Sequence, residues 1–279
     1  MNGWGEPMSR FITRTVDAGG LRTHFIDEGD GQPVVLIHGG GAGADAYSNW
    51  SKTIPILAPH YRVLAFDMLG FGKTAKPDGE FEYTQAARNK HLIAFLEALN
   101  LKKATVVGNS MGGATAIGAA VERPDLIGKL VLMGSAGLVT AISPSLQTIL
   151  HYNFTREGMV AIVRALTNDQ FPVDDELVDY RMKNALDPDA RRAYGATMKI
   201  IKEQGGLAYE ESFVARVQVP TLIVNGKQDK IVSLDLARRF LDLIPRSWGY
   251  FIPQCGHWAM IEHPGDFGSA TLNFIRNAH

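Results

Sequence analysis

The sequence predicts an α/β protein with a mostly parallel sheet, helices on both faces of that sheet and an inserted helical segment. Two observations predict the sheet. Short apolar runs without polar alternation recur along the chain, as in strands that are covered on both faces; they span residues 34–37, 63–66, 105–108, 130–133, 221–225 and 249–252. Helical patterns separate these runs, most clearly over 83–99, where leucine and phenylalanine recur at helical spacing. Strands that alternate with helices favour parallel pairing through right-handed crossovers.

An antiparallel hairpin is expected before the first buried run. Residues 11–16 and 21–26 both have strand-like composition, and they flank the turn sequence Asp17-Ala18-Gly19-Gly20. Two strand-like segments around a glycine-containing turn predict such a hairpin.

One long interval interrupts the alternation of strands and helices. From about Ala136 to about Phe213 the sequence shows no strand, and only helical stretches over 145–152, 157–166, 174–185 and 188–204. Such a stretch is too long for a single crossover between neighbouring strands. We therefore expect residues 136–213 to form a helical cap, inserted into an α/β core made of residues 1–135 and 214–279.

Composition limits the class of function. The chain has 28 Lys and Arg against 29 Asp and Glu, which gives no electrostatic case for nucleic acid or for an anionic membrane. Residues 1–11 contain no apolar run, and no stretch reaches the ~18 apolar residues of a membrane span. Cys255 is the only cysteine, which excludes an intramolecular disulfide and a cysteine-based zinc site. We expect a soluble, cytoplasmic protein.

The segment Gly108-Asn109-Ser110-Met111-Gly112 carries the clearest chemical signal. It ends a short β-branched run, and an alanine-rich helical stretch follows over 114–121. In this strand–turn–helix context the Gly-x-Ser-x-Gly pattern predicts a nucleophile elbow, a strained turn that exposes the Ser110 hydroxyl. Because the pentapeptide alone is a weak signal, the assignment depends on what else the chain places around Ser110.

A serine nucleophile needs a base and an acid, and the chain offers both in the order Ser, Asp, His. Among eight histidines, His257 lies in a loop after the last predicted strand, whereas His38 ends the first buried strand and is expected to shape a loop. Asp229 follows the strand at 221–225, at the strand end where parallel sheets place their ligands. Its role would be to orient the imidazole, although the sequence Gly-Lys-Gln-Asp is also turn-like.

A glycine loop follows the first buried strand, in the sequence His38-Gly39-Gly40-Gly41-Ala42-Gly43. Backbone amides in such a loop can stabilise a tetrahedral intermediate. Neither nucleotide-binding fingerprint fits, because no third glycine or Gly-Lys-Ser/Thr follows at the required spacing. The half P-loop Gly70-Phe71-Gly72-Lys73-Thr74 has Asp67 where the motif needs glycine, which indicates a structural turn.

The serine turn, Asp229, His257 and the glycine loop together resemble an α/β-hydrolase. The resemblance extends beyond the fold to one family within it. Several segments resemble the meta-cleavage-product hydrolases, which hydrolyse a carbon–carbon bond in the ring-opened dienoates of aromatic catabolism. The similarity spans the core on both sides of the cap and leans to the bicyclic or carbazole-pathway branch. The segments are 38–43 with Ser48-Asn49-Trp50, Asp67-Met68-Leu69-Gly70-Phe71-Gly72, Gly108-Asn109-Ser110-Met111-Gly112-Gly113 and Cys255-Gly256-His257-Trp258.

The resemblance implies roles for further residues by position. The backbone amides of Gly40 and Met111 would form the oxyanion hole. Asn49 and Asn109 would bind the carboxylate and oxo end of the dienoate, although Asn109 could instead only stabilise the elbow. Trp258 would line the pocket beside the base, or only pack. The remaining substrate-binding candidates in the loop are Gly39 and Gly41.

A cap arginine near the polar end of the substrate is also a family feature. Arg181 is the first candidate here, and the pair Arg191-Arg192 is the alternative, because the local sequence departs from the family pattern. Apolar cap residues would suit an aryl or alkyl tail, or would simply pack the cap against itself. They are Phe154, Met159, Ile162, Val163, Leu166, Phe171 and Met198.

The implied reaction turns a dienol into a ketone and then attacks the second carbonyl with Ser110 or an activated water. The products would be 2-hydroxypenta-2,4-dienoate and a carboxylic acid, with no metal or cofactor. The resemblance also implies a homo-oligomer. The nearest alternative is a carboxylesterase with the same triad, and a more distant one is a non-catalytic binding protein of the same fold.

Overall fold

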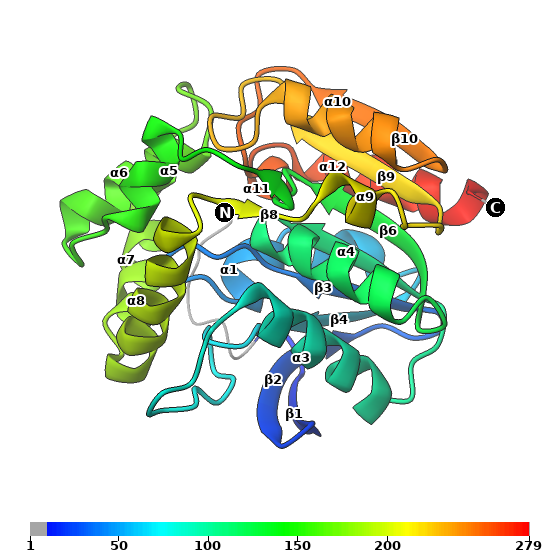
Figure 1. Cartoon of the computed structure of the whole chain (residues 1–279), viewed down its shortest axis with the longest axis horizontal. Helices are drawn as coiled ribbons and strands as arrows, with labels where there is room; N and C mark the ends of the chain where they lie inside the picture. The colour runs from blue at the N-terminus through cyan, green and yellow to red at the C-terminus, as the bar shows by residue number, and fades with distance from the viewer. Residues whose placement is uncertain (1–9, 279) are drawn as a thin grey trace.

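A computed structural model describes residues 10–278 of the chain. Figure 1 shows a central twisted sheet with helices on both sides, which confirms the predicted α/β class. Residues 1–9, which include most of the N-terminal stretch considered above, and His279 lie outside the described residues. Among the helices of residues 10–278, none combines the length and the hydropathy that crossing a bilayer requires.

The sheet has eight strands in the order β1-β2-β4-β3-β5-β6-β9-β10. β1 and β2 form the predicted hairpin and β2 pairs antiparallel with β4, whereas all other pairs are parallel. Every predicted strand is present. Their bounds are β1 (Thr13–Ala18), β2 (Leu21–Glu28), β3 (Pro33–Ile37), β4 (Arg62–Phe66), β5 (Ala104–Asn109), β6 (Ile127–Met133), β9 (Thr221–Gly226) and β10 (Ser247–Ile252).

Helices of the core cover the sheet on both faces (Figure 1). One face carries α3 (Gln85–Ala98), α4 (Met111–Glu122), α9 (Glu211–Val214) and α10 (Leu234–Leu243). The other carries α1 (Ala46–Trp50), α2 (Ile54–Leu57), α11 (Ala259–Glu262) and α12 (Pro264–Asn277). Both faces of the central strands are therefore dry, which explains why these strands are apolar runs without alternation.

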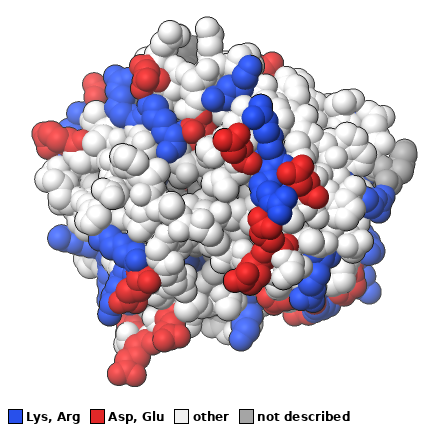
Figure 2. Space-filling model, turned by 45° about the horizontal axis from the view of Figure 1, so that its top comes forward, with Lys and Arg blue, Asp and Glu red and all other residues white. Residues whose placement is uncertain are grey.

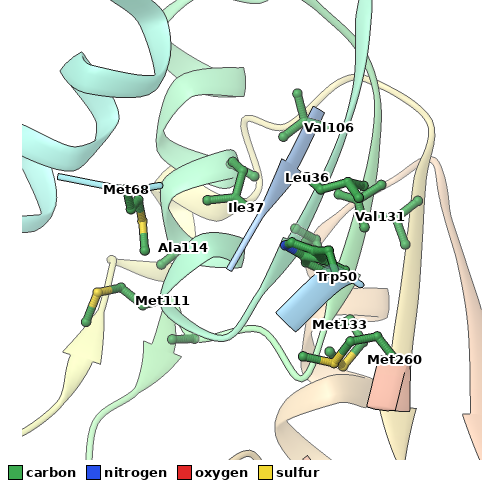
Figure 3. Close-up of a cluster of buried hydrophobic side chains, with 14 of the residues drawn as sticks. Leu36, Ile37, Trp50, Met68, Val106, Met111, Ala114, Val131, Met133 and Met260 are labelled. Carbon is green, nitrogen blue, oxygen red and sulfur yellow. The ribbon is translucent and has the colours of Figure 1, made fainter. Parts of the chain in front are cut away.

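Buried side chains fill the space between the sheet and both helix layers. Figure 3 shows two groups: Ile37, Met68 and Ala114 pack beside α4, and Trp50, Met133 and Met260 pack on the α1 side of the sheet. The Trp50 ring also stacks on Phe267 of α12, with 6.1 Å between ring centroids. This packing holds the carboxyl ends of β3, β5, β6 and β9 in fixed positions.

Four helices, called the cap below, leave the core after β6 and lie to one side of the sheet (Figure 1). They are α5 (Pro144–Leu150), α6 (Arg156–Leu166), α7 (Asp175–Ala185) and α8 (Pro188–Glu203). Each begins directly after a side chain that accepts a hydrogen bond from a first-turn backbone amide; these capping residues are Ser143, Thr155, Asp174 and Asp187. Such capping residues fix where a helix begins. The observed bounds differ from those of the predicted helical stretches by at most two residues.

The expectation that residues 136–213 contain no strand is wrong. β7 (Leu138–Val139) and β8 (Leu207–Ala208) form a short antiparallel pair where the chain enters and leaves the cap. Two residues are too few to show the alternation or the apolar run by which a strand is recognised in sequence. The pair fixes the two ends of the cap next to each other.

The surface carries both signs of charge in close proximity. On the face that Figure 2 shows, Lys and Arg side chains are interspersed with Asp and Glu. This agrees with the net charge of −1.

Candidate active site

Ser110 occupies the sharp turn between β5 and α4. Its backbone has φ 54° and ψ −119°, in a region that side-chain-bearing residues rarely adopt. The following Gly112 lies so close to β3 that a Cβ atom there would be 2.5 Å from the Ile37 carbonyl oxygen. Although Ser110 stands at the start of α4, its side chain makes no capping hydrogen bond. The strained turn thus leaves the Ser110 hydroxyl free for chemistry.

His257 and Asp229 form a buried pair. His257 Nδ1 lies 2.8 Å from Asp229 Oδ2, and the two side chains are 1% and 0% exposed. The other carboxylate oxygen accepts hydrogen bonds from the amides of Ile231 and Val232, at 2.8 and 2.9 Å. Because an ionised carboxylate only accepts, Nδ1 carries the hydrogen and Nε2 keeps its lone pair. This is the tautomer that a general base requires.

Ser110 and His257 line one cavity, called the central cavity below. Its empty volume is about 670 Å³, part of it open to solvent. Asp229 lies behind His257, outside the cavity wall. All the other predicted site residues line the cavity, namely Gly39, Gly40, Gly41, Asn49, Asn109, Met111, Arg181 and Trp258. The structure therefore brings together residues from both halves of the core and from the cap.

The glycine loop lies against Ser110 and the start of α4: a Cβ atom on Gly39 would be 3.3 Å from Ser110 Cβ, and one on Gly40 would be 3.4 Å from Met111 Cβ. Gly40 follows β3 and Met111 is the first residue of α4. The first amides of a helix have no partner within that helix, so the amide of Met111 is available to a ligand. His38 does not enter the cavity: its Nδ1 donates to the Gly39 carbonyl at 2.7 Å, and its Nε2 accepts from the Met68 amide at 2.9 Å. As expected, His38 shapes the loop.

Two asparagines meet beside Ser110. Asn49 Nδ2 donates to Asn109 Oδ1 at 3.2 Å, and Asn109 Nδ2 donates to the Met133 carbonyl at 3.1 Å. The Asn109 amide is thereby anchored to β6. Both roles considered for Asn109 are compatible with this position, because it lines the cavity and also ties the elbow to the sheet.

Arg181 extends from α7 into the central cavity. It is 0% exposed, its guanidinium carbon lies 4.9 Å from the centre of the Trp258 ring, and Nη2 donates to the Ala42 carbonyl at 2.7 Å. Within residues 10–278, no group accepts a hydrogen bond from its Nε or Nη1. Burial lowers the pKa of Arg181 to about 10, which leaves it charged at neutral pH. The cavity therefore holds a buried cation with unused donors.

The alternative arginines lie elsewhere. Arg191 stacks on the Phe154 ring at 4.3 Å, and Arg192 donates to the carbonyls of Pro77 and Lys76. Neither lines the central cavity. Of the three candidates, the structure places only Arg181 beside Ser110 and His257.

Comparisons with known proteins identify the family of the chain. Residues 32–264 match the family described as alpha/beta hydrolase fold. The chain is 58% identical to the 2-hydroxy-6-oxo-6-(2'-aminophenyl)hexa-2,4-dienoic acid hydrolase of Metapseudomonas resinovorans, over 96% of this chain and 92% of that protein. It is 34% identical to the 2-hydroxymuconate semialdehyde hydrolase of Pseudomonas sp. strain CF600, over 96% and 95%.

Solved structures give the same result. A crystal structure of a serine hydrolase involved in carbazole degradation superposes with a TM-score of 0.89 at 56% identity, and covers 95% of this chain and 99% of that one. A meta-cleavage product hydrolase from Pseudomonas fluorescens IP01 also has a TM-score of 0.89, at 32% identity over 95% and 98%. The chain belongs to the meta-cleavage-product hydrolases. Within the α/β-hydrolase fold, this membership confirms the resemblance seen in the sequence.

Most of the apolar cap residues considered do not line the cavity of this meta-cleavage-product hydrolase, in agreement with the alternative that they pack the cap against itself. Of the seven apolar cap residues considered, only Leu166 and Met198 line it. Helix α6 packs between α5 and α7, and its residues Met159, Ile162 and Val163 are buried within the cap. Residues that the sequence did not single out complete the wall: Ala44, Ala136, Val139, Leu146, Ile149, Leu150, Ile201, Leu207, Ile231 and Val232.

Two supporting residues also escaped the sequence analysis. Gly134 follows β6, and a Cβ atom there would lie 2.9 Å from His257 Nδ1 and 3.1 Å from Asp229 Oδ2. Glu262 of α11 accepts hydrogen bonds from the amides of Gly256 and Trp258, on either side of His257. A glycine directly after a predicted strand was the available signal for the first. No sequence signal marks Glu262, because its hydrogen-bond partners are backbone amides.

Proposed function

We propose that this protein hydrolyses the carbon–carbon bond of a 2-hydroxy-6-oxo-6-substituted hexa-2,4-dienoate with Ser110, His257 and Asp229 as its catalytic triad. The reaction class follows from the family, whose members matched above are named as hydrolases of such dienoates. This chain is accordingly a hydrolase that acts on carbon–carbon bonds of ketonic substrates. The residue roles below are our assignment.

The observation that carries the choice of substrate is the buried guanidinium of Arg181. Arg181 lines the same cavity as Ser110 and His257, and its Nε and Nη1 have no hydrogen-bond acceptor among residues 10–278. A buried cation without a hydrogen-bonded anion favours a ligand that brings a carboxylate, since a charge-assisted hydrogen bond is stronger than a neutral one. Dienoates carry that carboxylate, whereas a simple ester does not.

At the polar end of the substrate, Arg181 would hold the carboxylate together with Asn49 and Asn109. Gly39 and Gly41 let the substrate approach the loop backbone, and both line the cavity. With this end fixed, the 2-hydroxyl group of the dienol loses its proton and C5 takes up a proton, which gives the ketone. The bond that breaks then lies next to a group able to accept its electron pair.

At the reacting carbonyl, Ser110 Oγ attacks C6 while His257 Nε2 takes its proton. The amides of Gly40 and Met111 would stabilise the resulting oxyanion. Collapse of this intermediate breaks the carbon–carbon bond, the released dienolate leaves as 2-hydroxypenta-2,4-dienoate after protonation, and water then removes the acyl group as a carboxylic acid. Attack by a water that His257 activates gives the same products.

The tail of the substrate would lie against the apolar wall of the cavity. Trp258 and the residues of α5 and α8 provide a surface suited to an aryl group. The relative that is 58% identical is named for a 2'-aminophenyl substituent, which makes that ring our first choice of tail.

A side-by-side assay separates this proposal from the carboxylesterase alternative. The purified protein is given the yellow aminophenyl dienoate and 4-nitrophenyl acetate in parallel, and both are followed by absorbance. The proposal predicts faster loss of the dienoate, as judged by kcat/KM. Rapid ester hydrolysis with a stable dienoate would support the esterase instead.

Three further expectations stay predictions. These are the division into a core and a separate cap domain over 136–213, the homo-oligomer and the cytoplasmic location.

A further inference from the structure

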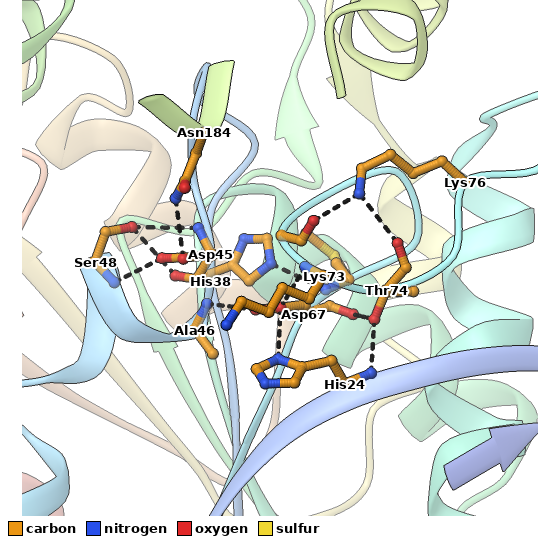
Figure 4. Close-up of polar contacts among 12 residues, drawn as sticks. His24, His38, Asp45, Ala46, Ser48, Asp67, Lys73, Thr74, Lys76 and Asn184 are labelled. Atoms are coloured by element: carbon orange, nitrogen blue, oxygen red, sulfur yellow. Dashed lines mark hydrogen bonds and ion pairs between the residues drawn. The ribbon is translucent and has the colours of Figure 1, made fainter. Parts of the chain in front are cut away.

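One buried carboxylate, Asp45, joins the cap to the core behind the polar end of the central cavity. Asp45 lies in the loop between β3 and α1. Its Oδ2 accepts a hydrogen bond from the Tyr180 hydroxyl at 2.5 Å and another from Asn184 Nδ2 at 3.1 Å. Both donors stand on one face of α7, four residues apart. Figure 4 shows Asn184 reaching from the cap toward Asp45.

The second carboxylate oxygen acts on the core. Asp45 Oδ1 accepts from the Ser48 amide at 2.7 Å, and the Ser48 hydroxyl accepts from the Asp45 amide at 3.2 Å. This reciprocal pair is a capping box, which fixes where α1 begins. Asn49, the next residue of α1, lines the cavity. The same carboxylate therefore fixes the start of α1, the helix that contains Asn49.

Arg181 depends on the same attachment. It follows Tyr180 in α7, and its Nη2 donates to the Ala42 carbonyl at 2.7 Å. Asn184 also donates to the carbonyl of Gly43 at 3.4 Å. Residues 42–45 thus hold α7 on both sides of Arg181, and the location of the guanidinium follows from how α7 docks on this loop.

We propose that Asp45 is a positioning residue for carboxylate recognition. Through Tyr180 and Asn184 it locates Arg181, and through the start of α1 it locates Asn49. Asp45 does not line the central cavity and acts only through these neighbours. The inference rests on the proposed function in one respect: Arg181 and Asn49 are taken to hold the carboxylate of the substrate.

If Asp45 only stabilised the cap, its substitution would have a different effect. It would lower the thermal stability and would weaken the binding of every ligand in the cavity to a similar degree. Substitution of a positioning residue instead weakens only the binding of ligands that carry the carboxylate. Matched ligands that differ in this one group therefore separate the two roles.

The principal variant is Tyr180→Phe. It removes one hydroxyl and keeps the ring that packs 5.3 Å from Tyr47. Asp45→Asn is the second variant, because the NH₂ group of asparagine would face hydrogen-bond donors at a position where the carboxylate oxygen accepts hydrogen bonds. Asp179→Asn is the control: Asp179 precedes Tyr180 in α7, but it is exposed and pairs with Arg156 on the outer side of the cap. If Asp45→Asn does not fold, Tyr180→Phe decides alone.

Binding of hexa-2,4-dienoate and of its methyl ester is measured by calorimetry for each protein, with KM and kcat for the aminophenyl dienoate alongside. For Tyr180→Phe we expect Kd of the carboxylate and KM to rise about tenfold, the effect of one charge-assisted hydrogen bond lost between a displaced Arg181 and the carboxylate of the ligand. Kd of the ester should change less than about twofold. The control should match the wild type. Equal losses for both ligands, or no loss for the carboxylate, would overturn the inference.

The two hypotheses can fail separately. If the wild type binds hexa-2,4-dienoate but does not turn over the aminophenyl dienoate, the proposed function fails and the binding comparison still decides the role of Asp45. If the wild type binds the methyl ester as tightly as the carboxylate, the cavity does not recognise the charge and the inference is overturned.

Discussion

His257 Nδ1 lies 2.8 Å from Asp229 Oδ2, and neither side chain reaches solvent. The Ile231 and Val232 amides hold the other oxygen of the carboxylate, so Asp229 cannot turn away from the imidazole. The pair comes from the ends of β9 and β10, which are adjacent in the sheet. Parallel pairing of these strands therefore places the proposed base and its proposed orienting acid at one edge of the sheet, the edge at which the serine turn follows β5.

Asp229→Asn should lower kcat strongly while the fold is kept. An amide at this position would favour the imidazole tautomer with its hydrogen on Nε2, which cannot take a proton from Ser110. The expected loss is about 10⁴-fold, the effect of this exchange in other serine triads. Dienoate turnover together with circular dichroism checks it. Activity within about tenfold of the wild type would exclude Asp229 as the orienting acid.

Arg181→Met should raise KM for the dienoate roughly 10- to 100-fold, as expected for lost charge-assisted hydrogen bonds. Hydrolysis of 4-nitrophenyl acetate, which has no carboxylate, should change little. Arg191→Met is the matched control, because Arg191 stacks on Phe154 outside the cavity. Steady-state kinetics on both substrates test this. Similar effects of the two variants would exclude Arg181 as the residue that binds the carboxylate of the substrate.

Glu262→Gln should loosen the loop that carries His257. The carboxylate accepts the amides of Gly256 and Trp258 from the loop and that of Asn168 from the cap, and a glutamine would present its NH₂ to one of these donors. We expect a loss of about 1–3 kcal/mol in the free energy of unfolding, with reduced kcat. Urea denaturation measures the first. Glu203→Gln, on the exposed side of α8, is the control and should behave as the wild type.

His91 should make the protein less stable in mild acid. Its Nδ1 accepts from the Leu69 amide at 3.0 Å and its Nε2 donates to Thr23 Oγ1 at 2.8 Å, so the folded protein holds it neutral. Burial lowers its pKa to about 4. Unfolded chains bind the proton near pH 6.5, so this contribution is full above pH 6.5 and is lost as the pH falls toward 4.

The resulting loss is about 3 kcal/mol between pH 7 and pH 4. His91→Gln removes the titrating group. Urea denaturation of both proteins at these two pH values checks the prediction, and the variant should show a smaller drop between them. An identical drop in the two proteins would show that other groups cause it.

Much of the core could be predicted from the sequence because the relevant signals are local. Strands covered on both faces are apolar runs, and the serine turn needs glycine at fixed spacing beside Ser110. The capped starts of the cap helices, such as Ser143 before α5, are local signals too. These features depend on neighbouring residues, so a single sequence displays them.

The remaining features depend on tertiary packing. Which face of a cap helix lines the cavity follows from how α5 to α8 pack, and so Ile149 lines it while Ile162 does not. Likewise Arg181 and Arg191 both lie in helical patterns, and only the docking of α7 separates them. Backbone-directed contacts such as those of Glu262 leave no pattern in the sequence.

A comparison of the wild-type protein with Ser110→Ala on the aminophenyl dienoate tests the proposed carbon–carbon hydrolysis by Ser110. Loss of visible absorbance is followed, and 2-hydroxypenta-2,4-dienoate and the carboxylic acid are identified by chromatography. We expect equal amounts of both products from the wild type and at least about a 10³-fold slower release from Ser110→Ala, which still binds the substrate. Product release at the wild-type rate from Ser110→Ala, or a dienoate that the wild type leaves intact, would contradict this proposal.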